Sequence, residues 1–437
     1  MTAAQGRRQL GFWMCVALVM GNMIGSGIFL LPAALAPHGL NSLPAWLFTA
    51  AGALLLAMVF SRLARALPEG GPYAYTLAAF GPLPAFLVAW GYWMSLWVGN
   101  AAIATGSVAY LTPFVPELGR SPQLAAAVTL GFVWLLTAVN AAGVRASGWV
   151  QGVTTVLKVL PLLAIAGLGL LQVRPAHLQA QAAIPLSVGG VTAAATLTLW
   201  SLLGLESATI PSGKVADPAR TIPRATLLGT ALTAAVYLVA CTTVLLLLPP
   251  AQAAASTSPF ADAARLFWGP RAAQLVAAFA ALSGFGALNG WILLQGEVPF
   301  TLARAGVFPA VLGRESRRGT PAVALAATSG LVSVLILLNA SQSLVKVFTF
   351  LLLVATGTSL FMYLACSLAL LRLGAQGRLG HAGRGTPGLA AVGGLAALYA
   401  LWTLIGAGWE ALLWGGALLA LGLPVYGAMR RGRATGP

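Results

Sequence analysis

The chain has 437 residues, of which 59% are hydrophobic and only 7% are charged. A soluble domain carries about 25% charged residues, so this composition excludes a water-soluble fold and predicts an integral membrane protein. The net charge of +16 does not indicate nucleic-acid binding, because the basic residues are spread over short segments between apolar stretches.

Twelve apolar stretches are long enough to cross a membrane as helices, for which about 20 residues are needed. In chain order they are expected at residues 11–35, 42–66, 83–112, 123–142, 149–171, 188–211, 223–249, 272–299, 321–339, 344–372, 387–407 and 409–429. With the N-terminus placed inside, most of the 24 Lys and Arg residues fall on the inner side of the membrane. The sequence therefore predicts an all-α membrane protein, a single domain over residues 1–437 with both termini in the cytoplasm.

The first and the sixth of these stretches are predicted to be interrupted helices. Residues 25–32 and 204–211 each run from a glycine to a proline, with small residues between them. Interrupted helices at corresponding positions of two halves are the best sequence indication of a transporter's binding site. The two halves are expected as inverted repeats at approximately 11–171 and 188–372, followed by two further helices at 387–429.

Glu206 lies inside the second interrupted segment, among apolar residues. A carboxylate at that depth of a membrane is costly and is functional by default. The three cysteines lie far apart inside apolar segments, so neither a metal site nor a redox site is expected.

Three motifs together resemble those of the amino acid–polyamine–organocation (APC) superfamily of membrane transporters. They are Gly21-Asn-Met-Ile-Gly-Ser-Gly-Ile-Phe-Leu-Leu-Pro-Ala33, Gly70-Gly-Pro-Tyr-Ala-Tyr75 and Leu199-Trp-Ser-Leu-Leu-Gly-Leu-Glu-Ser-Ala208. Within the superfamily, the bacterial arginine/agmatine antiporters are the most similar group, and the likeness covers nearly the whole chain.

The resemblance implies a LeuT-like fold of twelve transmembrane helices, in which a 5+5 inverted repeat is followed by two C-terminal helices and helices 1 and 6 are unwound at the midplane. It also implies a homodimer in the bacterial inner membrane that exchanges arginine for agmatine by alternating access. Its partners are then a small amino acid or amine substrate and the lipid bilayer. No cofactor and no enzymatic activity are expected.

The resemblance also implies which residues contact the substrate. Glycines let a helix unwind, and the N–H groups freed at a helix N-terminus attract a carboxylate, as expected for Gly25, Ser26 and Gly27. Carbonyl groups of helix 6 are expected to accept hydrogen bonds from the α-ammonium group. The predicted substrate-binding residues are Asn22, Met23, Gly25, Ser26, Gly27, Ser95, Leu96, Asn100, Trp200, Leu203, Trp291 and Ala355. For the amides of Asn22 and Asn100, hydrogen bonding between helices is an equal alternative.

The gates follow from the same resemblance. Trp200 is expected to close the outer side and Trp291 to cover the substrate side chain, where an aromatic face attracts a guanidinium ion. Tyr92, Glu206 and Tyr363 are expected to form the inner gate. Glu206 is also a candidate for proton uptake and release, and Tyr73 for a response to pH.

Several residues depart from the antiporter pattern. Leu96, Ile103 and Ala355 stand where that group has cysteine, methionine and serine, so the pocket is less polar, which weakens the case for arginine. Lys158 lies in the middle of the fifth stretch, where the arginine/agmatine antiporters have no lysine. Other superfamily members with such a lysine use it in place of a coupling sodium ion. Lys158 is therefore a candidate coupling residue, and a proton-coupled or neutral amino acid carrier remains an alternative.

Two other classes of function fit the sequence less well. An intramembrane serine protease acting through Ser26 would need a base within hydrogen-bond distance, and the three histidines lie in loops or at the ends of the stretches. A channel would show rings of carbonyls or charges, whereas this chain has one isolated carboxylate, Glu206, in the middle of an apolar stretch.

Overall fold

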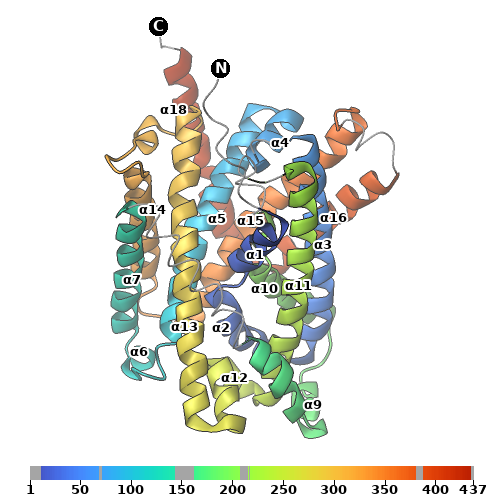
Figure 1. The fold of residues 1–437 in the computed structure, drawn as a ribbon, viewed down its shortest axis with the longest axis vertical. Helices are drawn as coiled ribbons and strands as arrows, with labels where there is room; N and C mark the ends of the chain where they lie inside the picture. The colour runs from blue at the N-terminus through green and yellow to red at the C-terminus, as the bar shows by residue number, and fades with distance from the viewer. Residues whose placement is uncertain are drawn as a thin grey trace.

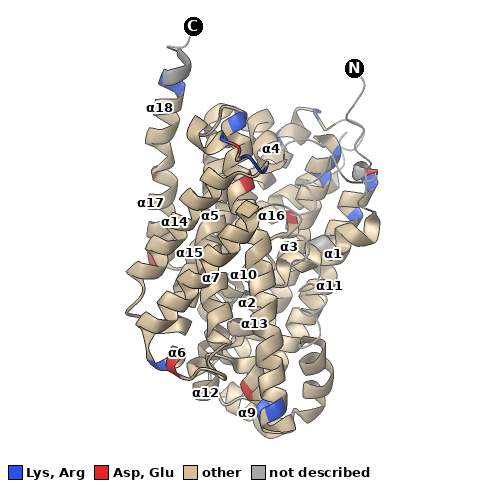
Figure 2. Ribbon diagram, turned by 60° about the vertical axis from the view of Figure 1, so that its left-hand side comes forward, with Lys and Arg blue, Asp and Glu red and all other residues tan. Residues whose placement is uncertain are grey.

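The computed structural model describes residues 11–67, 71–142, 162–206, 215, 217–379 and 387–434. The regular elements in these ranges are helices, and most run along the long axis of the molecule (Figure 1). Seven described helical stretches are long and apolar enough to cross a membrane, judged by length and composition. Charged residues lie mainly towards the two ends of these helices, and their middle portions are largely uncharged (Figure 2). This confirms the prediction of an all-α protein with several apolar spans.

The first apolar stretch is divided into two helices, α1 (Phe12–Met23) and α2 (Ser26–Leu35). Between them Ile24 has φ −76° and ψ 97°, and Gly25 has φ −127° and ψ −165°, so both residues are extended. A short 3₁₀ helix, η1 (Ala36–Asn41), then turns the chain into α3 (Ser42–Ala66). Its Gly39 has a φ of 51°, a value that favours glycine.

The helix α10 (Val188–Ser201) ends well before residue 211, where the sequence pattern places its end. The backbone of Gly204 explains part of this difference, because its φ of 99° lies in a region that L side chains rarely adopt. Residues 202–204 form a turn, and residues 205 and 206 form a short 3₁₀ segment. The chain therefore leaves the α-helix just before Glu206.

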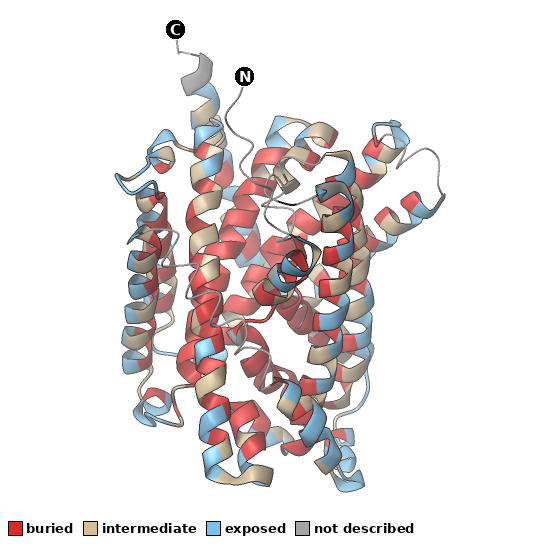
Figure 3. Ribbon diagram, in the orientation of Figure 1, coloured by how far each residue is buried: buried red, intermediate tan, exposed pale blue. Residues whose placement is uncertain are grey.

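The centre of the molecule is built around α5 (Pro82–Ala109), whose residues from Val88 to Ala109 are all buried. It packs against α15 (Leu344–Ala375) and α13 (Pro259–Arg304), and Figure 3 shows the buried residues concentrated where these helices meet α2 and α10. On the side of α1 and α3, the bundle is completed by α11 (Pro218–Leu247).

The remaining helices lie around this centre. They are α4 (Gly71–Phe80), α6 (Glu117–Arg120), α7 (Pro122–Ala142), η2 (Ile165–Gly169), η3 (Leu170–Gln172), α9 (Pro175–Ala182), α12 (Pro250–Ala255), η6 (Ala310–Gly313), α14 (Ala322–Leu338), α16 (Pro387–Gly406), α17 (Trp409–Ala420) and α18 (Gly422–Ala434). Many large apolar side chains on these outer helices are exposed, among them Leu171, Leu338 and Leu398. Such a surface fits contact with lipid.

Three further features differ from those expected. The helix predicted at 272–299 begins at Pro259 and turns at Gly269, whose φ is 81°. The last predicted helix is divided at Leu421 into α17 and α18. The helix α4 was not predicted, because its ten residues are too short for the length criterion of a membrane span.

Candidate functional site

A small cavity opens at the break between α1 and α2. The residues around it come from six helices and from the turn after α10. Its lining consists of Asn22, Met23, Gly25, Gly27, Ile28, Tyr92, Ser95, Leu96, Gly99, Ile103, Trp200, Ser201, Leu203, Glu206, Trp291 and Ser359. The structure therefore brings together most of the residues that the sequence analysis assigned to the substrate and the gates.

The last carbonyl groups of a helix lack partners within it, and two of those of α1 are bound by side chains of neighbouring helices. The Asn22 carbonyl accepts a hydrogen bond from Trp291 Nε1 at 3.2 Å. The Met23 carbonyl accepts one from the Tyr237 hydroxyl at 2.8 Å. Side chains of α13 and α11 thus hold the end of α1 in place.

On the other side of the break, α2 begins at Ser26 with Gly25 as its N-cap residue. The first N–H groups of a helix lack partners within it, and the helix dipole adds a partial positive charge. Gly25 and Gly27 carry no side chain and both line the cavity, so the start of α2 forms part of its wall. This end of the cavity can therefore bind a carboxylate.

The Trp200 indole occupies space that two glycines leave open. A Cβ atom added to Gly27 would overlap the Nε1 atom of Trp200, and one added to Gly99 would lie 3.0 Å from its Cη2 atom. The indole therefore packs between α2 and α5, and only 9% of Trp200 is exposed. A larger residue at either glycine would move the ring.

Glu206 provides the charge of the site, because it is the only charged residue among the described residues that line the cavity. Its carboxylate accepts a hydrogen bond from the Tyr363 hydroxyl at 2.8 Å and interacts with the backbone N–H groups of Gly204 and of Glu206 itself. The Tyr92 hydroxyl interacts electrostatically with the same carboxylate, without a hydrogen bond of good geometry. Only 2% of Glu206 is exposed, so a negative charge on this carboxylate would act on the cavity with little screening by water.

The other predicted residues lie outside this lining. Tyr363 and Ala355 are fully buried behind it on α15. The Asn100 amide points to Gln295, and its Nδ2 atom donates a hydrogen bond to Gln295 Oε1 at 2.7 Å. The sequence left open whether Asn100 contacts the substrate or forms a hydrogen bond between helices, and this conformation shows the hydrogen bond between helices.

The predicted residue Tyr73 is not at the cavity either. Tyr73 lines a separate cavity between α4, the start of α5 and α18, beside Tyr426 and Arg430. Lys158 lies outside the described residues, so its role stays a prediction. Ser26 contributes the first residue of α2.

Ser359, Gly99, Ile28 and Ser201 line the cavity without having been predicted. Helical periodicity could have found the first two. Ser359 lies one turn from both Ala355 and Tyr363, and Gly99 lies one turn from Ser95, and residues one turn apart share a face. Among the described residues, no group of three or more His, Cys, Asp or Glu side chains is placed to hold a metal ion.

Comparison with known proteins places the chain in a family. A family model described as amino acid permease matches residues 10–415. A putative arginine/ornithine antiporter of Bacillus subtilis is 34% identical over 403 residues, which cover 85% of each chain. A cadaverine/lysine antiporter of Escherichia coli is 36% identical over 320 residues, covering 72% of this chain and 71% of the relative. The putrescine transporter PotE of Escherichia coli is 29% identical over 429 residues, covering 96% of this chain and 95% of the relative. The chain therefore belongs to the amino acid permease family, within the APC superfamily of amino acid and polyamine transporters.

Proposed function

We propose that the chain is a secondary antiporter that exchanges a cationic amino acid for an amine or for a second cationic amino acid. The observation that carries this proposal is the cavity with Glu206 as its one charged residue among those described. A negative charge in a site shielded from water favours a cation over a neutral or an anionic ligand. The three relatives are named for arginine, ornithine, lysine, cadaverine and putrescine, all of which are cations or carry a cationic side chain.

The substrate's own groups find complementary partners around the cavity. The α-carboxylate would lie at the N-terminus of α2, and the α-ammonium group at the carbonyls where α10 ends. The cationic side chain would lie against the Trp291 ring, between the apolar side chains of Leu96 and Ile103. An amine without the carboxylate would use all but the first of these contacts, which fits a carrier that exchanges an amino acid for its decarboxylated product. The pair that the sequence resemblance favours is arginine and agmatine.

Alternating access would then follow from the two helix breaks. In this mechanism Trp200 closes the outer side, Trp291 covers the side chain, and Tyr92, Glu206 and Tyr363 close the inner side. The proposal includes the twelve-helix arrangement with inverted repeats at approximately 11–171 and 188–372. It also includes cytoplasmic termini and a homodimeric assembly in the inner membrane.

The test is uptake of radiolabelled arginine, lysine or ornithine into proteoliposomes preloaded with agmatine, cadaverine, putrescine, leucine or buffer. We expect uptake only when the vesicles contain a cationic amine or a cationic amino acid. A different result would contradict the proposal and favour a proton-coupled carrier: uptake of neutral amino acids that is driven by an inward proton gradient and does not depend on internal cations.

Replacing Trp291 by alanine is expected to weaken binding of a cationic amino acid by about tenfold or more, because a cation–π contact is worth about 1 kcal/mol at an exposed site and about 2 kcal/mol when shielded from water. Binding of leucine, measured as competition against the transported cation, should change less. The two dissociation constants from isothermal titration calorimetry check this. Equal losses for both ligands would show that Trp291 contributes only packing.

A further inference from the structure

A chain of buried side-chain hydrogen bonds crosses four helices next to the cavity. Asn100 Nδ2 on α5 donates to Gln295 Oε1 on α13 at 2.7 Å, and Gln295 Nε2 donates to Ser329 Oγ on α14 at 2.9 Å. The Ser329 hydroxyl then shares a hydrogen bond of 2.7 Å with Thr137 on α7. Asn100, Gln295 and Ser329 are fully buried, and Thr137 is 4% exposed.

This chain of hydrogen bonds begins directly beside the substrate site. On α5, Gly99 lies one position before Asn100 and Ile103 lies three positions after it. Both of these residues line the cavity, and Asn100 does not. Gln295 lies one turn after Trp291 on α13, so the two side chains share a face of that helix. The Asn100–Gln295 bond therefore joins the wall formed by α5 to the helix that carries Trp291.

We infer that Asn100 acts on the substrate site through Gln295, as a positioning residue that sets where the Trp291 ring enters the cavity. This inference rests on the proposed function, because it concerns how the same cavity holds its substrate. Trp291 has a second anchor, since its Nε1 atom donates to the Asn22 carbonyl at the end of α1. A rotation or shift of α13 would change both the depth of the ring and its bond to α1.

The physical reason is the cost of leaving a buried amide without a partner. When Asn100 loses its amide, Gln295 Oε1 stays buried with no donor, and a buried polar group in that state is strongly unfavourable. The helix α13 can relieve this only by moving Gln295 towards another donor. Because Trp291 lies on the same face of α13, the ring moves with it.

A double-mutant cycle tests the inference. The variants are Asn100→Leu, Gln295→Met and the two combined, and the readout is the dissociation constant of the cationic amino acid that the wild type transports. Each single change should weaken binding by about tenfold, and the combined change should weaken it no more than the larger single effect. Two results would overturn the inference by showing that Asn100 contacts the substrate directly: multiplied effects in the double variant, or weaker binding in Asn100→Leu with unchanged binding in Gln295→Met.

The exchanged pair Asn100→Gln with Gln295→Asn supplies a second test that does not depend on the folding of the single variants. It keeps the same donor, acceptor and number of side-chain atoms, so binding should return to within about threefold of the wild type. Binding as weak as in Asn100→Leu would contradict the inference, because a direct contact would be lost in both.

Thr105→Val is the matched control on α5. Thr105 is buried, and its hydroxyl bonds only to the Ala101 carbonyl of its own helix at 2.8 Å. Substrate binding should stay at the wild-type value in this variant. A wild type that binds and transports none of the tested cations would count against the proposed function, and a wild type that transports but shows multiplied effects would count against this inference alone.

Discussion

Replacing Glu206 by glutamine is expected to lower the exchange of cationic amino acids by about a hundredfold, because a hydrogen-bonded contact to a charged group is worth roughly 1.5–3 kcal/mol. Glutamine keeps the size of the side chain and removes the only charge among the described lining residues. It also replaces the acceptor that the Tyr363 hydroxyl contacts at 2.8 Å. The loss should therefore affect both attraction of the cation and closure of the inner side. The initial rate of counter-transport in proteoliposomes with equal amounts of reconstituted protein measures it.

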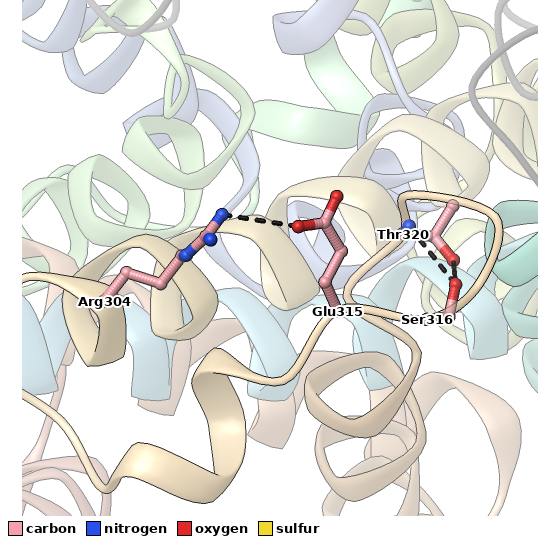
Figure 4. Close-up of polar contacts among 4 residues, drawn as sticks. All are labelled: Arg304, Glu315, Ser316 and Thr320. Atoms are coloured by element: carbon pink, nitrogen blue, oxygen red, sulfur yellow. Dashed lines mark hydrogen bonds and ion pairs between the residues drawn. The ribbon is translucent and has the colours of Figure 1, made fainter.

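Two further variants separate these contributions. Tyr363→Phe removes one hydrogen-bond donor and keeps the carboxylate, so its effect should be about tenfold and smaller than that of Glu206→Gln. Glu315→Gln removes a carboxylate far from the cavity, where Glu315 pairs with Arg304 at 3.4 Å on an exposed surface (Figure 4). Because an exposed ion pair contributes little to the stability of the fold, the Glu315 variant should transport at the wild-type rate. Full transport activity of Glu206→Gln, or an equal loss of activity in Glu315→Gln, would show that transport does not depend on the Glu206 carboxylate.

The positions of the helix breaks could be predicted because they depend on local chemistry. Gly204 has a φ of 99°, a value that favours glycine, and Gly25 is an extended residue between α1 and α2. Each lies in a stretch of small residues that the sequence displays directly. The residues beside a break then face a common space, and Glu206 could be placed there from the sequence alone, whereas Asn22 and Trp200 were assigned to the site by the family resemblance. Trp291 needed the family resemblance, because nothing local separates it from the other tryptophans.

Partners on different helices could not be predicted in the same way. Asn100 and Gln295 are separated by 195 positions in sequence, and their contact depends on how α5 and α13 pack and rotate. Tyr73 lies in a motif that resembles the family, yet the fold places it at another cavity with Tyr426 and Arg430. Spacing along one helix reports which residues share a face, and it does not report which helix that face meets.

Replacing Gly27 by alanine is the second change with a large expected effect. The new Cβ atom would overlap the Nε1 atom of Trp200, whose ring already lies close to Gly99 on its other side. An extra methyl group in a packed interior costs typically 1–3 kcal/mol unless a neighbour moves, and here the neighbour is the ring assigned to the outer gate. We expect exchange to fall by about a hundredfold while the protein remains folded, as checked by transport rate and melting temperature in detergent.

Two companion variants decide whether the ring is the cause. Gly330→Ala on α14 adds the same methyl group where nothing lies within 4 Å, so it should transport normally. Trp200→Phe removes the indole nitrogen that the new methyl group would meet. If displacement of the ring explains the loss, Gly27→Ala combined with Trp200→Phe should be as active as Trp200→Phe alone. If the combined variant is instead as inactive as Gly27→Ala, the methyl group must act on the first turn of α2 itself. Gly27 would then be required for backbone access to the substrate rather than for the space of the Trp200 ring.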